Sequence, residues 1–442
     1  MKKIFEPKSI ALIGASDELR TVGFGLANNL LIGKDKRKIY FINPKRKEVF
    51  GYKCFDVISD IKEKIDLVII AVPAKIVKSI VFGCCEKKVG AIIIVSSGFK
   101  EAGNAKEEEE IRELVKKYKI PLIGPNCLGI INPSLDLNAS FAPITPKKGS
   151  IAFLSQSGAL LDSVIDRNRM GFSKVVSYGN EADIDLSDFI EYLKTDKETK
   201  VIAIYFEGVK DGHKFMRIAK EVSNIKPIVA IKSGRSDKGK AAVGTHTGTL
   251  AGDYNVYQTA MKQSGVILVD TLEELFDVSL SLSLLPRCEN GIGIVTNGGG
   301  LGVLTVDYCS EMNIEIPGLS KATISFLEKN KAMEKVVNKN NPLDVLGDAL
   351  SDRYAVAIES LLKQDDINGL IVISTPQLMT EHDKNAKIIV ELRNKYPLKP
   401  IICCFLGGQS VDSAIDYLET NKIPNYTDTK RAVKSIRGLI KK

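Results

Sequence analysis

Histidine is scarce in this sequence of 442 residues, which contains only three. His213 and His382 stand among charged residues and are interpreted as exposed surface positions. His246 differs because small Gly and Thr residues surround it in the segment 244–252, which we expect to be a loop. An imidazole in such a setting can act as a nucleophile toward phosphorus when an acceptor fixes its tautomer. The candidate acceptor is Glu207, at the carboxyl end of an expected strand.

Two loops of the same pattern could bind phosphate groups. Ser155-Gln-Ser-Gly158 and Asn297-Gly-Gly-Gly300 each follow an apolar, strand-like run and precede a helix-like segment. The free N–H groups of a first helical turn, together with the helix dipole, attract anions. For either loop alone, a tight turn from strand to helix explains the small residues equally well. The presence of two such loops favours a shared phosphate.

A third glycine-rich segment, Gly14-Ala-Ser-Asp17 followed by Gly23-Phe-Gly25, comes after the first expected strand. Its spacing departs from the Gly-x-Gly-x-x-Gly fingerprint of dinucleotide-binding sites. After the second expected strand, where an NAD site has an acidic residue, the chain has Asn43-Pro-Lys-Arg46. Lysine at this place favours a phosphorylated ribose, which leaves NADP or a 3′-phospho-ADP compound such as coenzyme A. Nothing downstream resembles a nicotinamide redox site.

Short apolar strands alternate with helix-length amphipathic segments along the chain, which predicts an α/β fold with parallel sheets. The length fits three doubly wound domains, at residues 1–137, 150–285 and 291–442, with a polar linker over residues 138–150. The expected strands are residues 9–13, 38–42, 67–72, 91–95, 121–123, 151–154, 174–177, 201–206, 227–231, 266–269, 292–296, 369–374 and 400–405.

Composition excludes several classes of protein. The net charge is +8, but 62 basic and 54 acidic residues are interspersed and Trp is absent, so we expect no nucleic-acid partner. The apolar runs are too short for a membrane span and no secretory signal begins the chain, so we expect a cytoplasmic protein. No metal site is expected, because the eight cysteines include no Cys-x-x-Cys pair. A Walker A loop is excluded because Ala241 replaces the magnesium-binding hydroxyl.

A series of short motifs then runs along the whole chain. In these motifs and in their order, the chain resembles the α subunit of ADP-forming acyl-CoA synthetases (acetate-CoA ligases), which are relatives of succinyl-CoA synthetase. The resemblance implies a Rossmann-like CoA-binding domain followed by two flavodoxin-like domains. The motifs are Ile13-Gly-Ala-Ser16, Asn43-Pro-Lys45, Ala71-Val-Pro73, Gly124-Pro-Asn-Cys-Leu-Gly129, Ser155-Gln-Ser-Gly158, Tyr178-Gly-Asn180, Glu207-Gly208, Ser233-Gly-Arg235, Thr245-His-Thr-Gly248, Leu250-Ala-Gly252, Asn297-Gly-Gly-Gly300 and Asn341-Pro-Leu-Asp344.

The resemblance implies that acyl-CoA, phosphate and ADP are converted to a carboxylic acid, CoA and ATP, and the reverse. Phosphate attacks the thioester, His246 takes the phosphoryl group from the acyl phosphate, and ADP takes it from the phosphohistidine, with Glu207 holding the imidazole. A direct role for Cys127 or Asp344 is left open. The implied CoA-binding residues are Gly14, Ala15, Ser16, Lys45, Pro73, Val95, Ser96, Ser97, Asn126 and Cys127, and the implied phosphate-binding residues are Ser157, Gly158, Gly299 and Gly300.

Some members of the family fuse an ATP-grasp domain to these three, whereas this sequence ends at Lys442. We therefore expect a separate ATP-grasp β subunit, an α2β2 assembly, and Mg²⁺ arriving with ADP or ATP on that partner. No arginine clamp is evident, which favours a monocarboxylate such as acetate. Two alternatives are a non-catalytic CoA-sensing regulatory protein and a ligase for succinate, citrate or malate. The sequence leaves open the preferred acid, the physiological direction and the choice between ADP and GDP.

Overall fold

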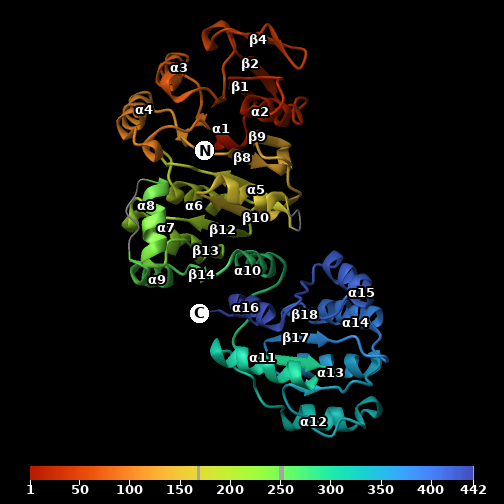
Figure 1. The fold of residues 1–442 in the computed structure, drawn as a ribbon. Coiled ribbons are helices and arrows are strands. Elements are labelled where there is room, and N and C mark those ends of the chain that lie inside the picture. Colours follow the sequence, from red (N-terminus) through yellow and green to blue (C-terminus); the bar gives the residue numbers. More distant parts are fainter. Residues whose placement is uncertain (167–169, 248–252, 442) are drawn as a thin grey trace. The chain divides into compact units, whose positions relative to one another are not determined.

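The structure is a computed structural model that describes residues 1–166, 170–247 and 253–441, with the side chains of residues 245–247 outside the description. The chain divides into two compact units, Met1–Thr271 and Leu272–Lys442, and each is described by itself. Both are α/β, and their sheets are built mainly from parallel strands (Figure 1), so the expected fold class is confirmed. In the described ranges, no helix combines the length and apolar character that crossing a bilayer requires.

The first sheet has strand order β3-β4-β2-β1-β5-β6-β7. β1 pairs in parallel with β2 on one side and with β5 on the other, so the winding direction reverses beside β1. Ligands of open α/β sheets bind at this reversal, beyond the carboxyl ends of the strands. The strands are β1 (Ser9–Ile13), β2 (Lys38–Ile42), β3 (Glu48–Val49), β4 (Tyr52–Phe55), β5 (Leu67–Ile70), β6 (Ile92–Ile94) and β7 (Leu122–Ile123).

Every residue of β1, β5 and β6 is buried, as expected for strands that helices cover on both faces. Of the four helices of this part, α2 (Val22–Leu31) is the one with a side-chain cap at its start. Thr21 caps the helix after β1, because its hydroxyl accepts a hydrogen bond from the Phe24 N–H at 3.2 Å. The helices are α1 (Lys2–Phe5), α2 (Val22–Leu31), α3 (Ala74–Glu86) and α4 (Ala105–Tyr118).

The second sheet has strand order β14-β13-β12-β10-β11-β8-β9, and it contains a hairpin that sequence reasoning missed. β8 lies antiparallel to β11, and β9 antiparallel to β8. The expected polar linker, residues 138–150, begins inside β9. In this strand, Asn138 and Ser140 are buried and hydrogen-bonded to each other at 2.6 Å. The strands are β8 (Gly129–Asn132), β9 (Leu137–Ser140), β10 (Lys148–Ser155), β11 (Phe172–Ser177), β12 (Val201–Phe206), β13 (Ile228–Lys232) and β14 (Ile267–Val269).

The segment that carries His246 also differs from expectation. Instead of a loop throughout, a helix, α8 (Asp237–Thr247), extends through position 246. Its start is stabilised by Ser236, whose hydroxyl accepts a hydrogen bond from the Gly239 N–H at 3.1 Å, and Lys and Ala residues that favour helix follow. The other helices of this part are α5 (Gly158–Asp166), α6 (Leu186–Thr195), α7 (Gly212–Ser223) and α9 (Tyr254–Gln263).

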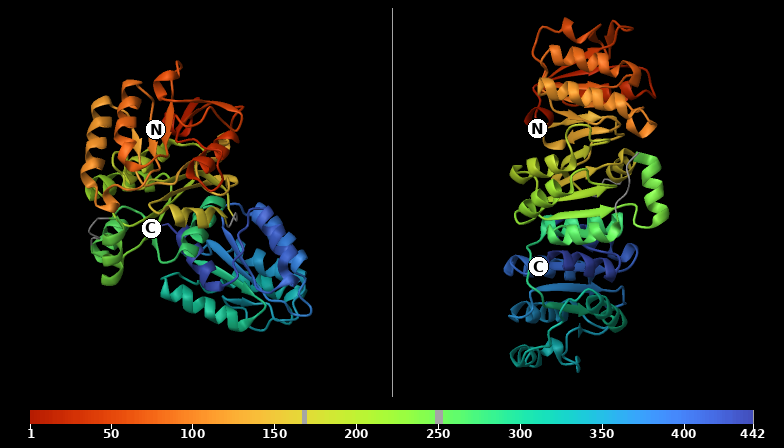
Figure 2. Two further views of the ribbon diagram at one scale, coloured as in Figure 1. Left: turned by 45° about the horizontal axis from the view of Figure 1, so that its top comes forward. Right: turned by 90° about the vertical axis from the view of Figure 1, so that its left-hand side faces the viewer.

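The second unit has a parallel sheet of order β16-β15-β17-β18, with helices on both faces (Figure 2). Its first helix, α10, packs against its last, α16, and Arg431 pairs there with Asp277 through two contacts of 2.7 and 2.8 Å. The strands are β15 (Ile292–Thr296), β16 (Leu343–Asp344), β17 (Gly369–Ser374) and β18 (Ile401–Phe405); the helices are α10 (Leu272–Leu284), α11 (Gly299–Glu311), α12 (Lys321–Glu328), α13 (Ser351–Lys363), α14 (His382–Lys395), α15 (Gln409–Thr420) and α16 (Thr429–Leu439).

Candidate functional site

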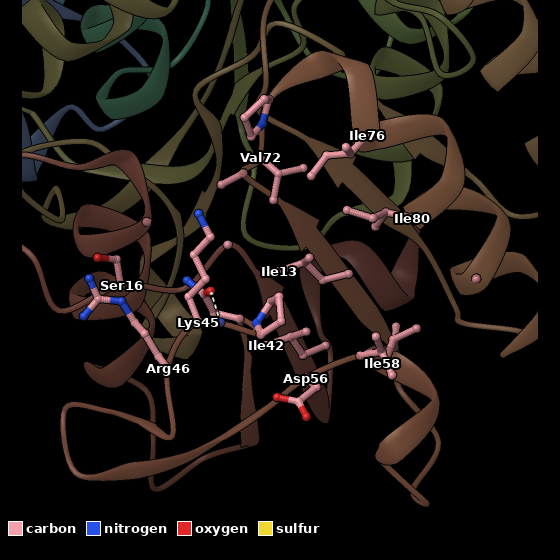
Figure 3. Close-up of a pocket in the computed structure, with 18 of the residues that line it drawn as sticks. Ile13, Ser16, Ile42, Lys45, Arg46, Asp56, Ile58, Val72, Ile76 and Ile80 are labelled. Atoms are coloured by element: carbon pink, nitrogen blue, oxygen red, sulfur yellow. Dashed lines mark hydrogen bonds between the residues drawn. The ribbon is translucent and has the colours of Figure 1, made fainter.

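A cavity of about 1190 Å³ opens at the carboxyl ends of β1, β2 and β5, where the winding reverses. We call it the nucleotide cavity. Gly14 and Ser16 line it from the loop after β1, and Lys45 lines it from the loop after β2. In Figure 3, Lys45 extends toward the region between Ser16 and Val72. The apolar part of the wall includes Ile13, Ile42, Ile58, Val72, Ile76 and Ile80.

The loop after β1 is packed directly onto its neighbours. Gly14 has φ +91°, and a Cβ atom built on it would lie 2.1 Å from the carbonyl oxygen of Ala71. The N–H of Gly14 donates a hydrogen bond to the Ile42 carbonyl at 2.9 Å. The Asn43 side chain donates to the Ala15 carbonyl at 2.9 Å and so ties the loops after β1 and β2 together. Glycine is required at position 14 because both the backbone angle and the space exclude a side chain.

Arg46 also lines the nucleotide cavity, although Lys45 was the one basic residue that sequence reasoning assigned to the CoA site. Its guanidinium hydrogen-bonds to Asp17 and, at 3.1 Å, to Glu18. Lys45 is exposed at the cavity wall and extends into the opening, whereas Arg46 is held by carboxylates. A third basic residue of the wall, Lys87, donates to the Ile61 carbonyl. In the sequence, the position of Arg46 directly after Lys45 was the signal that could have placed it in this cavity. This arrangement suits a ligand that carries several phosphate groups.

A second cavity, of about 670 Å³, shares four wall residues with the first: Val22, Ala71, Val72 and Pro73. We call it the reaction cavity. Its other walls come from four further segments of the first unit. The residues are Val95, Ser96 and Ser97 after β6, Asn126, Cys127 and Leu128 before β8, Phe141 after β9, and Gln156, Ser157, Gly158, Ala159 and Asp162 at the start of α5. The two cavities therefore adjoin each other at the shared wall.

Hydrogen bonds through Ser96 join the walls of the reaction cavity. The Ser96 hydroxyl donates to the Val72 carbonyl at 2.6 Å and accepts from the Val72 N–H at 3.1 Å. The Asn126 N–H donates to the Ser96 carbonyl at 2.9 Å. The Cys127 thiol donates to the Ile94 carbonyl at 3.3 Å, and burial raises the pKa of Cys127 to about 12. Cys127 is therefore a neutral thiol in the wall rather than a nucleophile.

The start of α5 has the geometry of an anion-binding helix terminus. The Ser155 hydroxyl accepts from the Ser157 N–H at 3.2 Å and donates to the Ser157 carbonyl at 2.7 Å, which fixes the turn. The Leu160 N–H donates to the Ser157 hydroxyl at 3.4 Å, which leaves the N–H groups of Gly158 and Ala159, in the first turn of the helix, for an anion. Because Gly158 has no side chain, a phosphate group can approach these N–H groups closely.

Models of three protein families match successive parts of the chain. A CoA binding domain matches residues 8–133, a succinyl-CoA ligase like flavodoxin domain matches residues 148–282, and a ligase-CoA domain matches residues 292–439. The α subunit of an ADP-forming acetate-CoA ligase I from Pyrococcus furiosus is 36% identical over 100% of this chain and 97% of that subunit. The chain belongs to the family of ADP-forming acetate-CoA ligases.

Other members of this family are longer. The ADP-forming acetate-CoA ligase of Methanocaldococcus jannaschii is 44% identical over the whole of this chain, but the chain spans only 63% of that protein's length. The same holds for ligase I of Archaeoglobus fulgidus, which is 43% identical, again with 63% of its length covered. A solved structure of the Korarchaeum cryptofilum dinucleotide forming acetyl-coenzyme A synthetase 1, in complex with phosphate and ADP, superposes with a TM-score of 0.94 at 34% identity, covering 99% of this chain and 96% of that one.

Most of the CoA-binding residues expected from family resemblance lie in the two cavities. Gly14, Ser16 and Lys45 line the nucleotide cavity, Pro73 lies on the shared wall, and Val95, Ser96, Ser97, Asn126 and Cys127 line the reaction cavity, as do the phosphate-binding candidates Ser157 and Gly158. Ala15 is fully buried, so its side chain is not part of a cavity wall. Sequence reasoning did not assign Val22, Phe141 or Asp162, because no motif marks them.

Glu207 is buried at the carboxyl end of β12, and its N–H donates to the Gln156 side chain at 2.8 Å. Next to it on the adjacent strand, Lys232 lies over the Tyr257 ring at 4.8 Å. Burial lowers the pKa of Lys232 to about 8, and the nearby Glu207 carboxylate opposes this shift. The His246 side chain lies outside the described residues, so its pairing with Glu207 stays a prediction.

The glycine loop of the second unit has the same hydrogen-bond pattern as the turn before α5. The Thr296 hydroxyl accepts from the Gly298 N–H at 3.0 Å and donates to the Gly298 carbonyl at 3.1 Å, as Ser155 does toward Ser157. Gly299 and Gly300 begin α11, and a Cβ atom on Gly299 would lie 2.7 Å from the Asp344 carboxylate. Sharing of one phosphate between this loop and the α5 loop remains a prediction.

The other two histidines are both described. His213 is exposed on α7, as predicted. The prediction of an exposed His382 is wrong, because its side chain is 8% exposed and its Nδ1 lies 3.0 Å from the Ser374 hydroxyl. Burial also lowers the pKa of His382. The charged neighbours of His382 mark the start of α14, but its ring faces the core beside Phe405.

Proposed function

We propose that the chain is the α subunit of an ADP-forming acyl-CoA synthetase, which interconverts acyl-CoA, phosphate and ADP with a carboxylic acid, CoA and ATP. The observation that carries this proposal is the wall shared by the two cavities. The nucleotide cavity suits a 3′-phospho-ADP group, and the shared wall leads from it to the start of α5. A thioester at the end of the pantetheine arm would therefore meet a phosphate bound at Ser157 and Gly158.

In this proposal, the N–H groups at the start of α5 hold the phosphate while one of its oxygens attacks the thioester carbonyl. The C–S bond breaks, and CoA leaves as its thiolate. The resulting acyl phosphate transfers its phosphoryl group to a ring nitrogen of His246, and the carboxylate leaves. Glu207 holds the other ring nitrogen and stabilises the charge that develops on the imidazole. The phosphohistidine then phosphorylates ADP, and Gly299 and Gly300 assist in binding the phosphoryl group.

We propose a monocarboxylic acid of the acetate type as the substrate. The family relatives are named for acetate, 4-hydroxybutyrate and trans-ferulate, which are all acids with one carboxylate. A relative named for succinate is 24% identical over only 51% of this chain. No basic side chain lines the reaction cavity among the described residues, which also disfavours succinate, citrate and malate.

We further propose a separate ATP-grasp β subunit, an α2β2 assembly, and Mg²⁺ that arrives with the nucleotide on that partner. Two relatives of nearly the same length as this chain are named as α subunits, which supports a separate partner. The cytoplasm is the proposed location. Co-purification of the chain with an ATP-grasp protein from its source, followed by a measurement of mass in solution, tests the partner and the stoichiometry.

The proposed activity is tested with the chain and its ATP-grasp partner, supplied with acetyl-CoA, phosphate and ADP. We expect release of the CoA thiol and formation of ATP, and omission of phosphate should abolish both. Binding of CoA without thiol release would instead support the CoA-sensing alternative. A ligase for a dicarboxylic acid would release thiol faster from succinyl-CoA than from acetyl-CoA.

Lys45→Ala is expected to raise the KM for CoA by about tenfold or more, because a hydrogen bond to a charged group contributes about 1.5–3 kcal/mol. The KM for phosphate should stay unchanged, because Lys45 lies in the nucleotide cavity rather than the reaction cavity. Steady-state kinetics in the direction of acyl-CoA synthesis measures the KM for CoA, and kinetics in the reverse direction measures the KM for phosphate. The matched control is Lys47→Ala, which removes an exposed lysine two positions away. Equal changes in both KM values would contradict the assignment of Lys45.

Glu207→Gln is expected to slow phosphoryl transfer to His246 by about 10²-fold or more, because the amide cannot stabilise the imidazole charge as a carboxylate does. The chain should stay folded, since glutamine keeps the volume of this buried side chain. Rapid-quench measurement of phosphohistidine formation gives the rate, and thermal unfolding reports the fold. Glu191→Gln, on the exposed face of α6, is the control. A normal transfer rate in Glu207→Gln would show that another group holds the imidazole.

A further inference from the structure

One side chain of the reaction cavity has no task in the proposed function. Asp162 is on α5, four residues after Gly158, and therefore on the same face of the helix. It lines the reaction cavity and is half-buried. Its Oδ1 atom is buried and has no hydrogen-bond partner among the described residues. A buried carboxylate oxygen without a partner is unusual, so this group requires an explanation.

The surroundings of Asp162 suggest that explanation. Among the described residues that line the reaction cavity, Asp162 is the only acidic one, and none is basic. The Cys127 thiol is neutral because burial raises its pKa to about 12. Uncharged side chains form the rest of the wall near the start of α5, including Val22, Leu128 and Phe141. The cavity therefore presents a single negative charge in an otherwise uncharged wall.

The helix fixes where this charge lies relative to the proposed chemistry. A residue rises by about 1.5 Å along an α-helix, so the Cα atom of Asp162 lies about 6 Å beyond that of Gly158 along the axis of α5. A phosphate at Gly158 is compensated by the N–H groups of the first turn, whereas N–H groups later in a helix are bonded within it and offer nothing to a second carboxylate beside Asp162. The space between the phosphate and Asp162 is where the acyl chain can extend from the thioester carbonyl.

We propose that Asp162 determines acyl specificity by excluding acyl groups that carry a second carboxylate. This inference rests on the proposed acyl-CoA synthetase function. A second carboxylate in this cavity would meet the Asp162 carboxylate and find no basic side chain to compensate it. Acyl chains that are apolar, or that end in a hydroxyl group able to donate to Oδ1, fit the same space. Burial raises the pKa of Asp162 to about 6, so the group is still mostly charged at neutral pH.

The test compares acetyl-CoA with succinyl-CoA, which adds a carboxylate to the acyl chain. The chain and its ATP-grasp partner are assayed for release of the CoA thiol in the presence of phosphate and ADP. Asp162→Asn keeps the shape of the side chain and removes its charge. We expect the ratio of kcat/KM for succinyl-CoA to kcat/KM for acetyl-CoA to rise at least tenfold, mainly through a lower KM for succinyl-CoA.

Asp166→Asn is the matched control, because it makes the same chemical change at an exposed position on α5. Its ratio should equal that of the wild type. An unchanged ratio in Asp162→Asn would overturn the specificity proposal. So would loss of turnover with both thioesters in an Asp162→Asn protein of unchanged Tm, since Asp162 would then act in the chemistry. Absence of thiol release from every acyl-CoA in the wild type would instead reject the proposed function.

Discussion

His246→Ala is expected to abolish ATP formation from acetyl-CoA, phosphate and ADP, a fall of at least about 10⁴-fold, because loss of a covalent intermediate removes the only proposed route to ADP. Binding of CoA should be retained, since the nucleotide cavity is built from the loops after β1, β2 and β5. A coupled ATP assay measures the first result, and isothermal titration with CoA measures the second.

The control for this variant is His213→Ala, which removes an exposed imidazole on α7. This variant should form ATP at the wild-type rate. ATP formation that persists in His246→Ala would contradict the phosphohistidine mechanism, whatever the state of CoA binding. If the variant lost both CoA binding and ATP formation, the substitution would instead have disturbed the fold.

Gly14→Ala is expected to reduce the free energy of unfolding by about 3 kcal/mol and to remove CoA binding. The new Cβ atom would lie 2.1 Å from the Ala71 carbonyl oxygen, and Gly14 has φ +91°, so strain and a backbone clash both act. Relief of the clash would move Ala71 in the wall shared by the two cavities. Denaturant unfolding and CoA titration measure the two effects.

Gly51→Ala separates the two causes. Gly51 also has a positive φ, +74°, but a Cβ atom there meets nothing within 4 Å. This variant carries only the backbone strain, which costs about 1–2 kcal/mol, and it should bind CoA as the wild type does. If Gly14→Ala and Gly51→Ala had equal effects on unfolding and both bound CoA, the close approach of the loop to Ala71 would not matter for the site.

The central strands of all three sheets could be predicted from the sequence. The bounds of β1, β2, β12, β15 and β17 agree with the expected ranges, because buried parallel strands are continuous runs of Val, Ile and other apolar residues. The strands that were missed, β3, β4, β8, β9 and β16, are short. In β9, Asn138 and Ser140 are polar yet buried, since their hydrogen bonds are made inside the fold. Local composition does not reveal such partners.

The candidate site, too, could be predicted from the sequence only in part. Gly14, Lys45 and Ser157 could be found because glycine-rich turns and basic residues at strand ends have a direct chemical meaning. Asp162 could not, because it stands in an ordinary amphipathic helix. Its place in the reaction cavity depends on the fold, which brings the residues after β6, the residues before β8 and α5 together. Both His213 and His382 were expected to be exposed because charged residues flank them in the sequence. The fold shows that the side chain of His382 is buried, whereas that of His213 is exposed.

In the proposed mechanism, phosphate passes through an acyl phosphate to His246. The most direct measurement supplies the chain and its ATP-grasp partner with acetyl-CoA and radiolabelled phosphate, without any nucleotide. Digestion after an alkaline quench locates the label. We predict alkali-stable, acid-labile label on the peptide that contains His246, appearing only with acetyl-CoA and accompanied by release of the CoA thiol. Thiol release with no label on this peptide would contradict the claim.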